Sequence, residues 1–188
     1  MILDVGGVET FWAVAGIPDF AHITIVNVAE AFEKSYWFPG TLPSLALQVG
    51  TAFDLSSWNS ERVDVVVSNS VIEHVGDWSC ITLAAREIRS VAESGWVQTP
   101  AFSFPIEPHF ALPFVHWFAP PLRAEILRRL PHHGAGDTKD IGRARMAAEE
   151  NNLLTANEMR FLFPDATLTR ERFLGLTKSL IVKWGRMA

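Results

Sequence analysis

The sequence predicts an α/β domain built on a mainly parallel β-sheet. Short apolar runs rich in Val and Ile recur along the chain, and several are apolar at successive positions, as expected of strands covered on both faces. Helical or turn-like stretches separate these runs, a pattern typical of strand–helix–strand units. The predicted strands are residues 1–5, 22–28, 45–49, 63–68, 95–99, 166–173 and 180–184.

Three helices are predicted from their end signals and their apolar periodicity. Asp77 caps a helix that runs to about residue 93, with Gly95 ending it. A second helix covers residues 121–130. Thr155 and Glu158 form a capping box before a third helix, which Pro164 stops. Between them, residues 131–142 carry Gly, His and Asp and are predicted to form a loop.

Residues 100–121 differ from the rest of the chain, because six prolines alternate with Phe, Trp and His. Proline at this density excludes a regular helix or a central strand. An irregular aromatic segment that follows a strand is suited to form the wall of a ligand pocket. The alternative is that its aromatic side chains simply cover the edge of the sheet.

Composition restricts the class of protein. With 188 residues, 48% hydrophobic and 20% charged, the chain fits one globular domain, residues 1–188, and not a disordered or fibrous protein. A net charge of −5 argues against a nucleic-acid partner. No apolar run reaches the roughly 18 residues that cross a bilayer, so no membrane partner is expected. Cys80 is the only cysteine, which excludes an internal disulfide and indicates a reducing, cytoplasmic location.

The chemistry-bearing residues gather at the ends of four predicted strands. In a doubly wound sheet, ligands bind outside the carboxyl ends of the strands, where the strand order reverses. Glycines in the first such turn let the backbone approach a ligand closely. The candidate residues are Asp4, Gly6 and Gly7 after the first strand, Asn27 after the second, Thr51 and Ala52 after the third, and Asn69 and Ser70 after the fourth.

The runs ILDVGG, GTAFDL, VDVVVSNSVIEHVGDW and AAREIRSVAESGW look like a class I S-adenosylmethionine-dependent methyltransferase. They are most similar to the small-molecule "type 11" methyltransferase domains, from Ile2 to about Pro100. The resemblance implies a Rossmann-like, doubly wound, seven-stranded sheet with an antiparallel last strand, in three αβα layers. It also implies that the cofactor is S-adenosyl-L-methionine and that the methyl acceptor is an oxygen or nitrogen atom of a small molecule.

The resemblance also implies a role for each candidate cofactor-binding residue. The turn with Asp4, Gly6 and Gly7 passes under the methionine part of the cofactor. Asn27 stands where the family usually has an acidic residue that binds the ribose hydroxyls. The remaining matches are Thr51 and Ala52 at the adenine edge, the latter through its backbone N–H, and Asn69 and Ser70 beside the sulfonium.

Two other function classes stay in view. Val8 and Thr10 stand where the family turn has further glycines, Asn27 replaces an acid and Thr51 replaces an Asp. These departures suggest, as an alternative, a catalytically degenerate methyltransferase-like domain that acts in binding or assembly. A nicotinamide-dependent oxidoreductase is disfavoured, because residues 6–11 lack the Gly-x-Gly-x-x-Gly turn.

The family normally has one or two helices before its first strand, and they cover the cofactor. Only Met1 precedes the first predicted strand here. We therefore expect these cap helices to be absent, and residues 100–164 to form a substrate-side insertion of loops and helices. Either the aromatic segment or a partner chain, such as the second copy in a homodimer, then closes the pocket, unless the true chain starts further upstream.

Glu107 and His109 lie two residues apart and are the first candidates for a catalytic base, with the carboxylate orienting the imidazole. The alternative is a structural loop pair. His74 is a weaker catalytic candidate, because a packed or solvent-facing histidine explains it as well. His116 with Glu107 and His109 resembles a metal triad, but no supporting pattern surrounds it, so no metal is expected.

Overall fold

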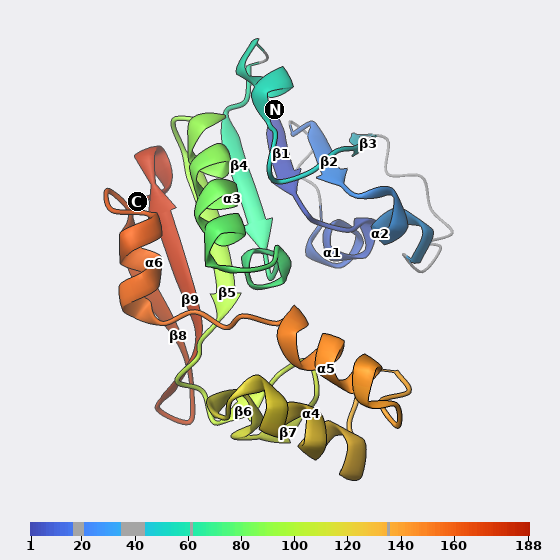
Figure 1. The fold of residues 1–188 in the computed structure, drawn as a ribbon. Helices are drawn as coiled ribbons and strands as arrows, with labels where there is room; N and C mark the ends of the chain where they lie inside the picture. Colours follow the sequence, from blue (N-terminus) through green and yellow to red (C-terminus); the bar gives the residue numbers. More distant parts are fainter. Residues whose placement is uncertain (17–20, 35–43, 61, 135) are drawn as a thin grey trace.

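The computed structural model describes residues 1–16, 21–34, 44–60, 62–134 and 136–188 and centres on a seven-stranded sheet in the order β3-β2-β1-β4-β5-β9-β8 (Figure 1). The first five strands are parallel, whereas β9 is antiparallel to both β5 and β8. The predicted fold class is therefore confirmed, including the antiparallel last pair. The strands are β1 (Ile2–Val5), β2 (Ile23–Asn27), β3 (Leu45–Val49), β4 (Val65–Asn69), β5 (Gly95–Pro100), β8 (Thr167–Phe173) and β9 (Leu176–Trp184).

Helices cover both faces of this sheet. On one face, α3 and α6 pack against the main core, which contains Leu3, Val66 and Val97. On the other face, α1 packs over β1 and β2 through Trp12 and Ile25. None of the helices within the described ranges is long and apolar enough to cross a bilayer. The helices are α1 (Glu9–Ala15), α2 (Ala29–Lys34), α3 (Trp78–Ser90), α4 (Pro120–Arg129), α5 (Ile141–Glu150) and α6 (Ala156–Leu162), with 3₁₀ turns η1 (Ser56–Ser60), η2 (Ile72–His74), η3 (Val115–Trp117) and η4 (Gly185–Met187).

The predicted helix starts are confirmed, and one predicted end is corrected. Asp77 accepts a hydrogen bond from the Cys80 N–H at 3.0 Å, and the capping box of Thr155 is complete. Helix α3 ends at Ser90, however, and Gly95 is the first residue of β5 rather than a helix stop. Helix α5 begins at Ile141, within the stretch predicted as a loop, because Asp140 caps it by accepting the N–H of Arg143.

The proline-rich segment after β5 forms, with α4 and α5, a small unit beside the end of the sheet (Figure 1). Its strands β6 (Ile106–Glu107) and β7 (Leu112–Pro113) have two residues each, in agreement with the proline content. A separate apolar cluster holds this unit together, and it includes Phe110, Leu127 and Ala144. The unit places the 100–121 segment beside the ends of β4 and β5.

Gly95 is packed against the indole of Trp184, so a methyl group at this position would overlap the ring. The ring is itself held by stacking on Phe163, with centroids 5.7 Å apart. We therefore expect Gly95→Ala to lower the free energy of unfolding by about 1–3 kcal/mol, measured by urea denaturation. Adding Trp184→Leu should recover part of this loss. Strictly additive effects of the two substitutions would contradict the overlap.

Candidate functional site

The order of the strands reverses between β1 and β4, and the crevice between their carboxyl ends is the expected ligand position. Gly6 begins the turn after β1 with φ +78°, and its N–H donates to the Val26 carbonyl at 2.7 Å. Val71, in the loop after β4, lies over Gly6 so closely that a methyl group on Gly6 would overlap it. Gly6 is thus required by both backbone conformation and space.

A cavity of about 260 Å³ opens at this crevice. It brings together four of the eight predicted cofactor-binding residues, Gly6, Asn27, Thr51 and Ala52, from three different strand ends. The turn at Thr51 is held by a bridge to Asp54, and the Thr51 hydroxyl accepts the N–H of Phe53 at 3.3 Å. The other lining residues are Val26, Val28, Gly50, Phe53, Val71, His74 and Val75.

Asn27 uses its side chain to hold the glycine turn. Its Nδ2 donates to the carbonyls of Gly6 and Gly7, both at 2.9 Å. Its Oδ1 accepts the N–H of Val28 at 2.8 Å. Both amide hydrogens are therefore committed to the backbone, and Gly7 takes part in the site through this contact. The ribose-binding role that the resemblance implies for Asn27 is left to the second lone pair of Oδ1.

Asp4 lies beneath the same turn. It lines neither this cavity nor a larger one beside β5 and β9. Its carboxyl group is buried against Gly7, and Oδ2 accepts the indole N–H of Trp12 at 2.7 Å. Oδ1 has no hydrogen-bond partner within the described part of the chain. Burial raises the pKa of Asp4 from 3.8 to about 6, although the hydrogen bond from Trp12 opposes this rise.

A larger cavity of about 560 Å³ lies on the β5–β9 face of the sheet. Asn69 and Ser70 line this cavity, so the eight predicted cofactor-binding residues do not share one cavity. The Ser70 hydroxyl donates to Gln98 Oε1 at 2.8 Å. The predicted aromatic segment forms one wall, and the remaining lining residues are Trp96, Gln98, Pro100, Ala101, Phe104, Ile106, Pro108, Glu171, Lys178, Ser179 and Ile181.

Glu107 and His109 do form a pair, in which Glu107 Oε1 and His109 Nδ1 are 2.6 Å apart. The second oxygen of the Glu107 carboxylate accepts the N–H of Phe110 at 2.6 Å. Burial lowers the pKa of His109, but the hydrogen bond and charge of Glu107, together with the charges of Glu73 and Glu150, outweigh burial, so the pKa lies above its ordinary value. Neighbouring Ile106 and Pro108 line the larger cavity, whereas Glu107 and His109 do not.

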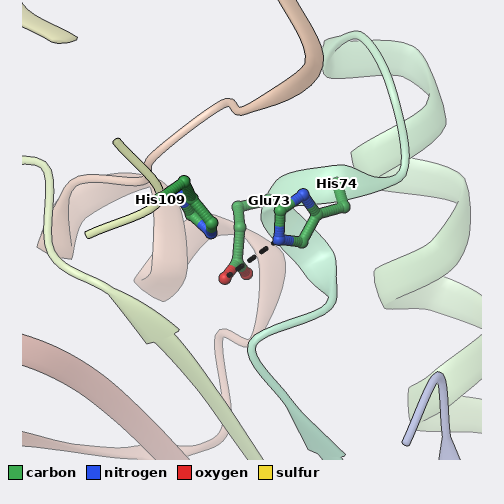
Figure 2. Close-up of side chains that lie close together, drawn as sticks. All are labelled: Glu73, His74 and His109. Atoms are coloured by element: carbon green, nitrogen blue, oxygen red, sulfur yellow. Dashed lines mark ion pairs between the residues drawn. The ribbon is translucent and has the colours of Figure 1, made fainter. Parts of the chain in front are cut away.

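The imidazole of His109 instead meets Glu73 and His74 (Figure 2). The two imidazole rings lie edge to face, with centroids 4.6 Å apart. Burial raises the pKa of Glu73 to about 6, and burial, together with the charge of His109, lowers the pKa of His74 to about 4. His116 lies outside this group and its Nε2 bonds the Phe102 carbonyl at 2.9 Å.

Sequence reasoning missed Glu73, although it stands in the motif VIEHV next to His74. The nearby residues Val71, Ile72 and Val75 are apolar, a signal that the short turn faces the core. In the structure Glu73 is fully buried and accepts the hydroxyl of Thr99 at 2.9 Å. A carboxylate within a short apolar turn is therefore as strong a signal of a buried polar site as the histidine beside it.

The chain resembles known proteins in its three-dimensional structure. No family model and no curated protein matches the chain. A SAM-dependent methyltransferase from Anabaena variabilis ATCC 29413 matches 98% of this chain and 76% of its own, with a TM-score of 0.60 and 10% identity. Magnesium protoporphyrin IX methyltransferase from Synechocystis PCC 6803, solved with bound SAH, matches 97% and 72%, with a TM-score of 0.55 and 12% identity.

A third solved structure, described as putative Zn-dependent alcohol dehydrogenases from Rhodobacter sphaeroides, matches 98% of this chain and 83% of its own, with a TM-score of 0.59 and 12% identity. Among other matched solved structures, this chain spans as little as 48% of one chain's length and as much as 88% of another's. At such identities the likeness concerns the fold alone. The fold is that of the class I S-adenosylmethionine-dependent methyltransferases, as the sequence motifs predicted.

Proposed function

We propose that this chain is an S-adenosylmethionine-dependent methyltransferase that acts on an oxygen or nitrogen atom of a small molecule. The observation that carries the proposal is the pair of cavities on either side of the loop after β4. The smaller cavity collects residues that follow β1, β2 and β3, and the larger one begins at Asn69 and Ser70. Methyltransferases among the structural neighbours, one of them solved with SAH, support this assignment.

The residues of the smaller cavity suit the adenosyl half of the cofactor. At about 260 Å³ this cavity lies just below the range of about 300–1,000 Å³ of whole-ligand sites. Gly6 offers backbone without a side chain, and Thr51 and Ala52 form the tight turn that would lie along the adenine edge. Asn27 and Asp4 act on the turn from below, Asn27 through its carbonyl contacts and Asp4 by filling the space under Gly7.

When bound, the cofactor supplies a methyl group on a positively charged sulfonium. The chain's own part is to hold the acceptor in line with that methyl group, and such orientation is worth about 7–11 kcal/mol. Asn69 and Ser70 lie where the two cavities approach each other. Trp96 and Phe104 give the larger cavity an aromatic wall, and polar side chains such as Gln98 also line it, which favours an aromatic or sugar-like acceptor.

An acceptor that loses a proton also needs a base. The Glu107–His109 pair remains our candidate. Neither side chain lines either of the two cavities, and His74, whose ring meets that of His109, lines only the smaller, cofactor-side cavity, so the pair does not touch the acceptor directly. This indirect position makes the pair a positioning and proton-storing group rather than a direct contact. The matching experiment is the pH dependence of methyl transfer in Glu107→Gln.

Cofactor binding is the first test. We expect the wild-type protein to bind S-adenosylmethionine and its demethylated product in calorimetric titration. Ala52→Phe places a ring in the smaller cavity and should weaken binding at least about tenfold, which is about 1.4 kcal/mol. Val14→Phe is the matched control, because Val14 lies on the exposed face of α1, and it should bind like the wild type. Equal weakening in both variants would contradict the site.

A degenerate methyltransferase-like domain is the second candidate function. It is favoured by Asn27, whose neutral amide is largely committed to the turn where the family uses a free acidic group. A folded wild-type protein that binds neither form of the cofactor would support this candidate and exclude the first. Binding without transfer to any of a broad set of hydroxyl and amine acceptors would also favour it.

A further inference from the structure

Three side chains able to bind a metal ion meet at the junction of the two cavities. Glu73 and His74 come from η2, whereas His109 comes from the turn after β6 (Figure 2). One ligand atom of each lies within 4.8 Å of the others. His74 lines the smaller cavity, and Pro108, next to His109, lines the larger one.

Glu73 is the observation that points to a cation here. Its side chain is fully buried, and only one carboxylate oxygen has a hydrogen-bond partner, the Thr99 hydroxyl. The other oxygen, Oε1, has none within the described residues. The nearest cationic candidate is His74 Nε2 at 4.0 Å, too far for a hydrogen bond. A buried carboxylate oxygen left without a partner is costly, and a bound cation would satisfy it.

His109 is oriented as metal-binding histidines usually are. Metal-bound imidazoles typically donate their other ring N–H to a carboxylate, which fixes the tautomer and the ring plane. In His109 the Nδ1–H donates to Glu107 Oε1 at 2.6 Å, and the Glu107 carboxylate is itself held by the N–H of Phe110. Nε2 is then the nitrogen left for a ligand, and Figure 2 shows the imidazole of His109 directed towards Glu73.

We propose that Glu73, His74 and His109 bind one divalent ion of the first transition row, such as Zn²⁺, Mn²⁺, Fe²⁺ or Co²⁺. Two imidazoles with one carboxylate favour these ions over Mg²⁺ and Ca²⁺, which prefer oxygen ligands. Bonds of about 2.1 Å to three ligands need ligand atoms about 3.4 Å apart, so the side chains move inward by about 1 Å or less. His74 and His109 are 36% and 22% exposed, which leaves the ion a way in.

The ion would join two distant parts of the chain, the loop after β4 and the 100–121 segment, between the two cavities. Three protein ligands leave at least one coordination position open to water or to a donor atom of a ligand. Metal binding is measured directly, so this proposal does not depend on methyl transfer. A failure to bind metal would not exclude methyl transfer, and a failure of methyl transfer would not exclude metal binding.

The wild-type protein is stripped with a chelator, equilibrated with Zn²⁺, Mn²⁺, Co²⁺ or Mg²⁺, and analysed for bound metal by mass spectrometry. We expect one equivalent of a transition ion, a visible Co²⁺ spectrum and a melting temperature that rises with free metal. No uptake by the folded wild-type protein, or uptake of Mg²⁺ in preference to Mn²⁺ and Zn²⁺, overturns the proposal.

Variants then locate the ion. Glu73→Gln and His109→Gln should lose the bound equivalent, and Glu107→Gln should weaken affinity about 10–100-fold by freeing the His109 ring. His133→Gln is the matched control, because His133 is exposed and outside the group. Circular dichroism checks that each variant is folded. Unchanged affinity in folded Glu107→Gln and His109→Gln overturns the assignment even if Glu73→Gln fails to fold.

Discussion

Gly6→Ala is expected to lower the free energy of unfolding by about 2–5 kcal/mol and to abolish cofactor binding. Two effects contribute to this loss. An L-residue at φ +78° costs about 1–2 kcal/mol, because its Cβ crowds the following carbonyl. The new methyl group also overlaps the side chain of Val71, and overpacking of this kind costs about 1–3 kcal/mol. Any outward movement of Val71 takes place at the rim of the smaller cavity, which Val71 lines.

Gly16→Ala separates the two effects. Gly16 follows α1 with φ +79°, almost the same as Gly6, but no atom of the described residues lies within 4 Å of the methyl position. It should therefore show a backbone cost alone, about 1–3 kcal/mol for a φ/ψ region that only glycine readily adopts, and leave cofactor binding unchanged. Urea denaturation and calorimetric titration of both variants measure the difference. Equal losses of stability would mean that Val71 does not restrict the turn.

Buried parallel strands are predictable from sequence, because both faces demand apolar residues. Residues 1–5 and 63–68 show this in near-continuous Val, Ile and Leu. The strand pair β8–β9 was harder to place, since exposed positions dilute its apolar pattern, and β9 starts at Leu176 rather than 180. Helix α5 was missed although Asp140 is a good N-cap, because the neighbouring glycines suggested a loop.

The site was predictable only where backbone topology alone positions the residues. Gly6, Thr51 and Ala52 meet because the carboxyl ends of parallel strands share one edge. Side-chain direction was not predictable in the same way. Asn27 lines the cavity but commits its side-chain N–H groups to the turn, an arrangement that depends on the carbonyls of Gly6 and Gly7 lying within reach. In the proline-rich segment no periodicity indicates that Ile106 and Pro108, rather than Glu107, line the larger cavity.

Asp4 should make the stability of this protein fall as the pH rises from about 4 to about 6. Its pKa is raised to about 6 in the folded protein, against 3.8 for an unperturbed carboxyl group. Between these values the folded chain keeps a proton that the unfolded chain has released, so stability decreases with pH. Below about pH 3.8 Asp4 is protonated in both states, and the cost of burying a charged carboxylate vanishes. Above about 6 the full cost, on the order of 3 kcal/mol, is present.

Asp4→Asn tests this directly, because Asn is neutral at every pH and can still accept the hydrogen bond from Trp12. The free energy of unfolding of the variant, relative to that of the wild type, should rise by on the order of 3 kcal/mol between pH 4 and pH 7. Urea denaturation of both proteins measures this difference. Comparing the two proteins cancels the effects of the other titrating groups.

The control is Asp54→Asn. Hydrogen bonds from Ser56 lower the pKa of exposed Asp54, so its pH dependence should be weak and of opposite sign. If the gain of Asp4→Asn over the wild type is the same at both pH values, the Asp4 carboxyl group is solvated rather than buried beneath the turn.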